Sequence, residues 1–499
     1  MTNARPEVHA RLDATDTGPV LDKNLYGHFA EHLGRCIYEG LWVGEDSSIA
    51  NVRGMRSDVL EALKQLNVPV LRWPGGCFAD EYHWEDGVGP RSERPKRINS
   101  HWGGVVENNH FGTHEFMALV EELGADAYIA GNAGSGSPRE MQEWVEYLTA
   151  PQATTLAERR RQNGREQPFR VPYFGVGNEC WGCGGNMRPE YYADLYRRLA
   201  TFVKNYDQSQ RIQRVACGPN GDDYEWTHVL MSRASGHFDA LSLHYYTLPT
   251  GTWSAKGSSI DFDESGWFHT LKNTLRMDEL IAKHSAIMDR FDPERRVGLF
   301  VDEWGSWYDP LPGTNPGFLE QQNTVRDAVL AALNLHVFHR HARRVRMANL
   351  AQSVNVLQAL VLTNGAQMLK TPTYWVFEMF KAHQGATSLE VQLEAPEYHF
   401  GDAAILGLSA SASRSKTNGS ILLSLVNPHP TRALILSCAI AGASVRTARS
   451  RVLSADRIDA RNTFEAPNSV APREHPVALA GDTLRLELPA KSVVACELC

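Results

Sequence analysis

Two glutamates, Glu179 and Glu303, stand where the sequence points to acid–base and nucleophilic chemistry. Glu179 follows the apolar run VPYFGVG, and Glu303 follows the similar run RVGLFVD; each run predicts a short buried strand. Cleavage of a glycosidic bond needs one carboxylic acid to protonate the leaving oxygen and one carboxylate to attack the sugar or activate water. The pair predicts this chemistry if the fold brings both strand ends to one place.

Neighbouring polar and aromatic residues strengthen the prediction of a sugar site. Asn178 can bond a hydroxyl beside the reacting carbon, and Tyr246, two residues after His244 at the end of another predicted strand, can orient a nucleophilic carboxylate. Aromatic ring faces pack on the apolar faces of sugars, although any single aromatic residue fits a protein core equally well. The aromatic residues at or just after predicted strands are Trp73, Trp84, Trp102, Tyr245, Tyr246 and Trp307.

Two metal-like patterns compete with this interpretation. His28-Phe29-Ala30-Glu31-His32 matches H-x-x-E-H, but zinc binding by that motif needs a helix, and this run resembles a strand end. Glu31 is better explained as an acceptor for substrate hydroxyls. The eight cysteines include two CxxC pairs, at 180–183 and 496–499, which we interpret as free thiols rather than a four-thiolate zinc site. The expected chemistry requires no metal and no organic cofactor.

The elements that must position these residues alternate between strand and helix. Eight such alternations predict a (β/α)8 barrel, in which strand-end residues meet at the carboxyl-terminal mouth. Glu179 ends the fourth expected strand and Glu303 the seventh. The expected strands are 25–31, 69–76, 127–132, 171–177, 214–220, 240–246, 297–304 and 355–364. The expected helices are 55–67, 113–124, 137–148, 188–206, 223–234, 274–291, 320–340 and 372–383.

After about residue 386 the helical periodicity stops. Short alternating runs separated by turn signals, such as SILLSLVN and TLRLEL, predict a β-sandwich. Residues 8–15 alternate like an edge strand with no helix after them, and we expect them to join that sheet. The expected domains are therefore a catalytic barrel over 21–385 and a β-sandwich formed by 1–20 with 386–499.

Bulk composition excludes several partners. The 499 residues carry a net charge of −8, whereas nucleic-acid and anionic-membrane partners favour a basic surface. No stretch approaches the roughly 20 apolar residues needed to span a bilayer. The first twenty residues lack the apolar core of a secretory signal, so we expect a cytoplasmic protein.

Assembled in order, these segments resemble glycoside hydrolase family 51, the retaining α-L-arabinofuranosidases of the clan A barrels. The resemblance spans residues 26–360 and agrees with the C-terminal sandwich. The segments that carry it are YGHFAEHLGRCIYEGLWVG, LRWPGGCFADEYHWEDGVGP, YFGVGNECWGCGG, LHYY, VDEWGSWY and MANLAQSVNVLQAL.

The resemblance implies an exo-acting enzyme that releases arabinofuranosyl residues from arabinan- or arabinoxylan-derived oligosaccharides. Glu179 would be the general acid/base and Glu303 the nucleophile. A homo-oligomer, tetrameric or hexameric, is implied as well. The substrate-binding residues would be Glu31, Cys77, Trp102, Asn178, His244, Tyr246, Trp307 and Gln352.

Retention predicts that the two catalytic carboxyl groups lie ~5–5.5 Å apart. Two alternatives stay open at this point. One is a clan A β-glycosidase acting on xylosides or glucans, and the other is a non-catalytic sugar-binding or zinc-binding protein.

Overall fold

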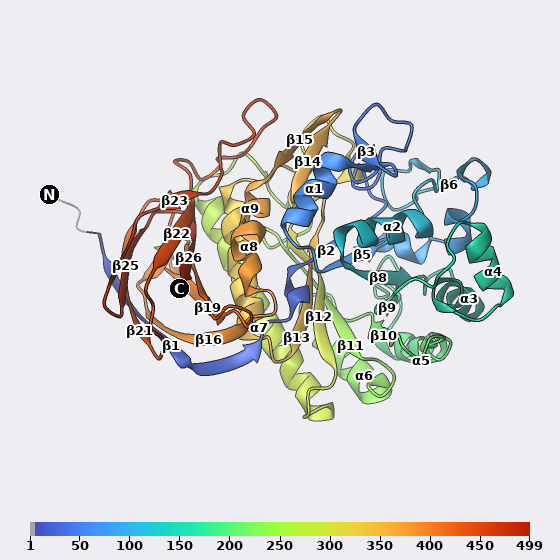
Figure 1. Cartoon of the computed structure of the whole chain (residues 1–499), viewed down its shortest axis with the longest axis horizontal. Coiled ribbons are helices and arrows are strands. Elements are labelled where there is room, and N and C mark those ends of the chain that lie inside the picture. The colour runs from blue at the N-terminus through green and yellow to red at the C-terminus, as the bar shows by residue number, and fades with distance from the viewer. Residues whose placement is uncertain (1–4) are drawn as a thin grey trace.

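A closed barrel of eight parallel strands forms the larger part of the molecule (Figure 1). The computed structural model describes residues 5–499, apart from the side chain of residue 16. The barrel confirms the expected fold class. Its strands are β2 (Gly27–Phe29), β5 (Val70–Trp73), β8 (Asp126–Gly131), β9 (Tyr173–Val176), β10 (Gln213–Ala216), β11 (Ala240–Thr247), β12 (Gly298–Ser306) and β13 (Val345–Ala351).

Helices follow the strands and cover the barrel. Ser137 caps the helix α3 through its side chain, with Pro138 in the first turn, as its sequence predicts. The helices are α1 (Ser57–Gln65), α2 (Thr113–Leu123), α3 (Pro138–Thr149), α4 (Thr155–Gln162), α5 (Pro189–Ala200), α6 (Tyr224–Ala234), α7 (Glu264–Phe291), α8 (Val325–Arg340) and α9 (Pro372–Phe380).

The eighth barrel strand differs from its prediction. It is β13 (Val345–Ala351), whereas the expected strand 355–364 begins in a turn and ends in the hairpin of β14 (Val361–Asn364) and β15 (Gln367–Lys370). The segment VRMANLA is interrupted by Arg346 and Asn349, whereas the run NVLQALVL ends in the unbroken apolar stretch ALVL. Because Asn349 is nevertheless buried in the barrel, apolar content alone pointed to the wrong segment.

A second body is one continuous sheet of ten strands. The N-terminal strand β1 joins it, as expected, but lies in its interior, parallel to β21 and antiparallel to β16, and is not an edge strand. Residues 1–4 of the expected N-terminal segment lie outside the described residues. The strands are β1 (Glu7–Val20), β16 (Thr387–Glu394), β19 (Ser409–Arg414), β20 (Ile421–Asn427), β21 (Leu434–Ala441), β22 (Ala448–Leu453), β23 (Arg473–His475), β24 (Val477–Ala480), β25 (Thr483–Leu488) and β26 (Ser492–Leu498).

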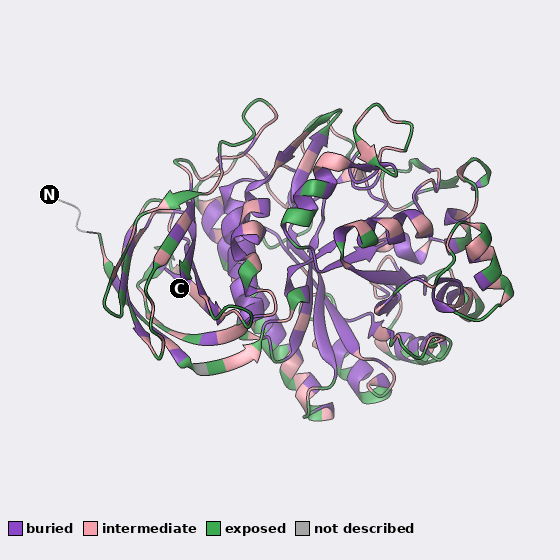
Figure 2. Cartoon of the chain, viewed as in Figure 1, coloured by how far each residue is buried: buried purple, intermediate pink, exposed green. Residues whose placement is uncertain are grey.

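This sheet has two buried faces. Leu423 and Leu425 of β20 enter a core formed within the sheet, whereas Leu422 and Val426 pack with the barrel residues. Helix α8 lies between sheet and barrel and is buried on all sides from Val325 to His339 (Figure 2). The division into two facing sandwich layers and the exact domain boundaries stay predictions.

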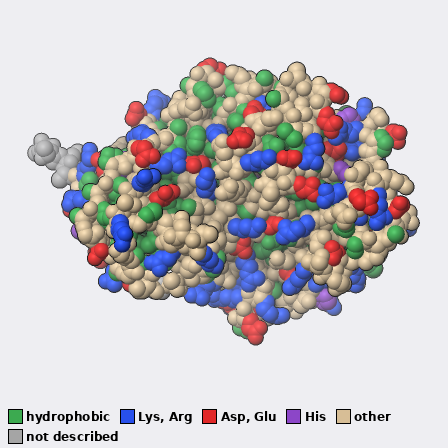
Figure 3. Space-filling model, in the orientation of Figure 1, with side chains coloured by type: hydrophobic (Ala, Val, Ile, Leu, Met, Phe, Trp, Pro, Cys, Tyr) green, Lys and Arg blue, Asp and Glu red, His purple; other side chains and the backbone are tan. Residues whose placement is uncertain are grey.

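Four small hairpins complete the described fold. They are β3 (Asn51–Val52) with β4 (Met55–Arg56), β6 (Arg97–Ile98) with β7 (Val106–Glu107), β14 with β15, and β17 (Glu397–Phe400) with β18 (Ala403–Leu406). Acidic and basic side chains alternate over the visible surface without a large patch of one sign (Figure 3). Among the described residues, none of the helices has the length and apolarity to cross a membrane.

Candidate active site

An irregularity in the pairing of β11 with β12 brings two acidic residues into the barrel mouth. Ser242 lies opposite Phe300, but His244 lies opposite Glu303, so three steps on β12 match two on β11. Such a bulge changes the alternation of side chains along a strand. Asp302 and Glu303 are consecutive, yet both are buried and both contact His244.

The turn after β9 presents Glu179 in an unusual backbone conformation. Gly177 has φ 88°, and a Cβ there would lie 2.7 Å from the sulfur of Cys180, so only glycine fits. Glu179 itself has φ 41°, in the left-handed region that disfavours residues with a Cβ. Strain of this kind clusters at functional sites, where surrounding contacts hold it in place.

His244 joins the two glutamates. Its Nδ1 lies 2.8 Å from Oε1 of Glu179 and 3.5 Å from Oε2 of Glu303. Carboxylate oxygens of Glu179 and Glu303 lie within 4.8 Å of each other and of this nitrogen. The ends of the fourth barrel strand, β9, and the seventh, β12, therefore meet in the barrel mouth.

Glu303 is held by two donors. Nη1 of Arg72 donates to its Oε1 at 2.7 Å, and the Tyr246 hydroxyl donates to its Oε2 at 2.7 Å. The other Arg72 nitrogen, Nη2, donates to Oδ1 of Asn178 at 2.6 Å. These bonds fix the direction of the Glu303 carboxyl group.

Electrostatics separate the protonation states of Glu179 and His244. Burial raises the pKa of Glu179, and the Glu303 carboxylate adds to this effect, although the bond from His244 opposes it. Burial alone would lower the pKa of His244, but the carboxylates of Glu303 and Asp302 outweigh it and raise this pKa well above its ordinary value. Glu179 is thus suited to hold a proton, and His244 is suited to carry a positive charge.

A small cavity opens beside these groups. Its lining residues are Glu31, Leu33, Gly76, Cys77, Trp102, Glu179, Tyr246, Glu303, Trp307, Leu319, Gln352 and Leu357.

Glu31 forms the far wall of this cavity. Its carboxyl group accepts bonds from the Trp102 indole at 2.8 Å, the Phe78 amide at 3.1 Å and the Gln352 amide at 2.9 Å. Burial, supported by the negative charge of Glu303, raises the pKa of Glu31 to about 8. A Cβ at Gly76 would lie 2.6 Å from its Oε1, so glycine permits this close approach.

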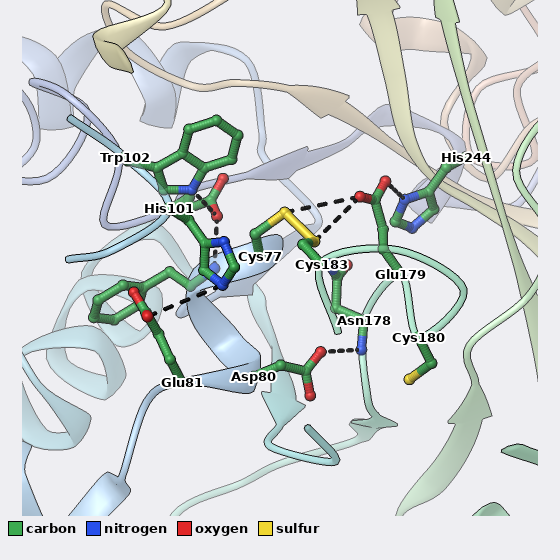
Figure 4. The surroundings of a disulfide bond; sticks show 12 residues. Cys77, Asp80, Glu81, His101, Trp102, Asn178, Glu179, Cys180, Cys183 and His244 are labelled. Atoms are coloured by element: carbon green, nitrogen blue, oxygen red, sulfur yellow. Dashed lines mark hydrogen bonds and ion pairs between the residues drawn. A yellow bond between two sulfur atoms is a disulfide. The ribbon is translucent and has the colours of Figure 1, made fainter. Parts of the chain in front are cut away.

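A disulfide between Cys77 and Cys183 forms another part of the wall. Figure 4 shows it between Trp102 and Glu179, with both sulfurs directed toward Oε2 of Glu179, at 3.8 and 3.4 Å. The expectation of free thiols is therefore wrong for Cys183. The partner in space comes from a different loop and not from the CxxC pair, so sequence spacing could not reveal it.

Some buried polar atoms of the site lack a protein partner. They include Nδ2 of Asn178, Oε1 of Gln352 and Nε1 of Trp307. A buried donor or acceptor without a partner is costly, and a bound polar ligand would satisfy it.

Among the described residues, two groups of three side chains bring metal-type donor atoms within 4.8 Å of one another. The first group is Cys77, Glu179 and Cys183, and the second is Glu179, His244 and Glu303. In the first group the two sulfurs are bonded to each other. In the second, the imidazole contacts both carboxyl groups directly. This donor chemistry suits proton transfer better than metal binding.

The H-x-x-E-H motif separates in the fold. Both ring nitrogens of His32 contact protein groups, Glu107 at 2.9 Å and the Trp73 indole at 3.0 Å. The His28 ring packs 4.8 Å from that of Phe377. The motif supplies Glu31 to the cavity and no paired imidazoles.

Of the ten residues expected at the site, eight line the cavity. Asn178 and His244 lie behind it, bonded to Arg72 and Glu179. Trp73 and Trp84 do not face the cavity but lie fully in the core. Arg72 and Asp302 were missed, because a lone charged residue in a strand gives no signal of the partner it meets across the barrel.

Comparison with known proteins identifies relatives over nearly the whole chain. Residues 62–264 match the sequence model of the "Alpha-L-arabinofuranosidase 1 domain", and residues 302–492 match that of the "Alpha-L-arabinofuranosidase C-terminal domain". The chain is 48% identical over 481 residues to an intracellular exo-α-L-arabinofuranosidase of Bacteroides ovatus, covering 96% of this chain and 93% of that protein.

Solved structures agree with these sequence matches. The GH51 arabinofuranosidase from Xanthomonas axonopodis pv. citri superposes with a TM-score of 0.97 at 52% identity, over 99% of this chain and 100% of that chain. The α-L-arabinofuranosidase from Thermotoga maritima, in an arabinose complex, has a TM-score of 0.88 at 30% identity, over 98% and 99%.

Proposed function

The chain belongs to the α-L-arabinofuranosidases of glycoside hydrolase family 51, and from this premise we propose how it acts and on what. It is an exo-acting α-L-arabinofuranosidase. The proposed substrates are oligosaccharides derived from arabinan or arabinoxylan, which carry terminal arabinofuranosyl groups. The observation that carries the mechanism is the approach of Glu179 and Glu303 within 4.8 Å.

That approach supports retention by double displacement. Carboxyl groups lie ~5–5.5 Å apart in retaining glycosidases and ~6.5–9.5 Å apart in inverting ones, which must leave room for water. Glu303, oriented by Arg72 and Tyr246, attacks the anomeric carbon and forms a glycosyl–enzyme ester. Glu179 gives its proton to the leaving oxygen in the same step.

The second step reverses the roles. Glu179, now ionised, removes a proton from an incoming water molecule, and this water attacks the anomeric carbon and releases Glu303. His244, in contact with both glutamates, offsets the negative charge that moves between them. The net reaction is hydrolysis with retained configuration.

The cavity supports exo action on one sugar ring. Glu31 and the unpartnered Oε1 of Gln352 would bond furanose hydroxyls at the closed end, and Nδ2 of Asn178 would donate to a hydroxyl near the reacting carbon. Trp102, Trp307 and the disulfide at Cys77 would bound the ring. These substrate contacts are part of the proposal.

We also propose where the enzyme is located, how it assembles and how its domains divide. A cytoplasmic location is supported by the relative from Bacteroides ovatus, which is named intracellular. A homo-oligomeric assembly is supported by the family resemblance, and the domain division at residues 20 and 385 by the loss of helical periodicity after about residue 386.

The test is hydrolysis of 4-nitrophenyl α-L-arabinofuranoside by the wild type and by Glu303→Ala, with and without azide. We expect turnover to be lost in the variant and restored by azide, with the azide adduct in the inverted configuration. Glu115→Ala is the matched control, because it removes a buried carboxylate that pairs with Arg94 outside the cavity. Turnover of xylosides or glucans in preference to the arabinoside would contradict the proposal, as would activity surviving in Glu303→Ala.

A further inference from the structure

Asp302 is a buried acidic group of the barrel mouth to which the proposed reaction gives no task. It is 2% exposed and does not line the cavity. Its Oδ2 accepts a bond from the Tyr128 hydroxyl at 2.7 Å and lies 3.7 Å from Nε of Arg72. Its Oδ1 lies 2.9 Å from Nε2 of His244, an ion-pair contact, and accepts no hydrogen bond from the described residues. An acidic side chain this deeply buried needs a reason, because burying a charge is costly.

The contact with His244 links Asp302 to the reacting groups. The imidazole has Asp302 on its Nε2 side and both glutamates on its Nδ1 side. A neutral imidazole has one N–H, so it could donate on one side only, whereas an imidazolium donates on both. Only the charged form carries an N–H toward Asp302 and another toward the glutamates at the same time.

The charges of the buried groups around His244 balance only when His244 is an imidazolium. The groups around His244 are Glu179 after β9, Asp302 and Glu303 on β12, Tyr246 on β11, Arg72 on β5, Tyr128 on β8 and Glu31 after β2. With Glu31 and Glu179 protonated, the carboxylates of Asp302 and Glu303 face two cations, Arg72 and His244. Without a charge on His244, one buried carboxylate would lack a counter-charge.

We propose that Asp302 is a positioning residue whose carboxylate holds His244 as the imidazolium that orients Glu179 and offsets the charge of Glu303. Its effect on catalysis rests on the function proposed above, but the charge on His244 does not. The bulge in β12 is the structural device, since it turns Asp302 and Glu303 toward the same imidazole from consecutive positions.

Asp302→Asn tests this, because asparagine keeps the size of the side chain and an acceptor for Tyr128 while removing the charge. In the variant, His244 would lose its proton near neutral pH, and both glutamates would lose a neighbouring cation. With His244 neutral, Glu179 would lose its proton only at higher pH, so the basic limb of the kcat/KM profile would move up by about one pH unit. We expect kcat to fall roughly 10- to 100-fold, with a smaller change in KM, because bond breaking and not substrate binding is affected.

The direction of the pH shift separates this role from a merely structural one. If Asp302 contributes only its own negative charge, its removal leaves the site more positive, and the basic limb moves to lower pH. A downward shift or an unchanged profile overturns the proposal. Asp302→Glu restores the charge and should recover part of kcat, and Asp292→Asn, which removes a buried carboxylate paired with Arg344, should leave both limbs in place.

A second readout does not depend on activity. In protein labelled with ¹⁵N-histidine, the His244 resonances, assigned by their loss in His244→Gln, should stay at imidazolium positions from pH 5 to 8 in the wild type. In Asp302→Asn they should titrate within that range. A neutral His244 in the wild type, or a charged one in both proteins, overturns the proposal. Inactivity of every protein toward arabinosides would instead overturn the proposed function and leave this readout intact.

Discussion

Two clusters of this protein contain buried histidines, and their partners leave one histidine charged and the others neutral. In the barrel mouth, His244 lies among Glu179, Asp302 and Glu303, and these carboxylates hold it protonated. The second cluster, the histidine–serine interface, lies between the barrel and the ten-stranded sheet. Its members are His336 and His339 of α8, His383 of the turn after α9, Ser409, Ser411 and Ser413 of β19, and Ser424 of β20.

Neutral hydroxyl groups surround the imidazoles of the histidine–serine interface. His336 contacts Ser409 and Ser424, both at 2.9 Å, and His383 contacts Ser413 at 2.7 Å and Ser424 at 2.9 Å. His339 contacts Ser411 at 2.8 Å and the Tyr26 hydroxyl at 3.0 Å. A hydroxyl can donate or accept, so it suits a neutral imidazole on either nitrogen.

The comparison separates the effect of burial from the effect of partners. Burial lowers the pKa of His383 to about 3, and it lowers those of His336 and His339 well below the ordinary value. His244 is equally enclosed, yet adjacent carboxylates reverse the result. The first cluster therefore uses histidine as a fixed cation for chemistry, and the second uses it as a neutral connector between two bodies.

The sharpest way to break this comparison is His244→Gln, which removes the cation between the two glutamates. We expect kcat/KM for 4-nitrophenyl α-L-arabinofuranoside to fall about 10³-fold, because Glu179 loses its orientation and the charge of Glu303 loses a counter-charge. The exposed His228 provides the control His228→Gln, which should retain full activity. Activity within tenfold of the wild type would show that His244 is not needed as a cation.

The histidine–serine interface should respond in stability and not in chemistry. His336→Ala would leave a cavity and deprive Ser409 and Ser424 of a partner, at a cost of about 3 kcal/mol in the free energy of unfolding. Urea unfolding measures this loss, and kcat/KM of the folded variant should equal that of the wild type. A loss of activity without a loss of stability would contradict a purely connecting role.

The sequence predicted most of the barrel-mouth cluster and none of the histidine–serine interface, for physical reasons. Glu179, His244 and Glu303 were found because strand ends of a barrel share one mouth, so chemistry-bearing residues can be assigned without knowing their contacts. The role of Asp302 depends on a bulge of one residue, which strict alternation along a strand does not foresee.

The histidine–serine interface was not predicted at all. In β19 the residues alternate as Ser-Ala-Ser-Ala-Ser, and Ala410 and Ala412 face the inner core of the sheet while the serines meet α8. From sequence, such serines suggest a solvated face of a sheet. Their partners lie about 70 residues away on a helix whose position relative to the sheet follows only from the packing of the two bodies.

A smaller effect, in pH dependence, tests whether the interface histidines are neutral. The pKa of His383 is about 3 in the folded protein and ~6.5 when unfolded, so between these values the unfolded chain binds a proton that the folded chain does not. Its contribution to stability is therefore present above about pH 6.5 and is lost as the pH falls, by about 1.4 kcal/mol per pH unit.

His383→Gln keeps polar atoms for Ser413 and Ser424 but cannot titrate, so its free energy of unfolding should fall less steeply between pH 6 and 4 by about this amount. Urea titrations at pH 6, 5 and 4 measure the slope, and His228→Gln is again the control. An unchanged slope would mean that His383 is already protonated in the folded protein, and the contrast with His244 would then rest on His336 and His339 alone.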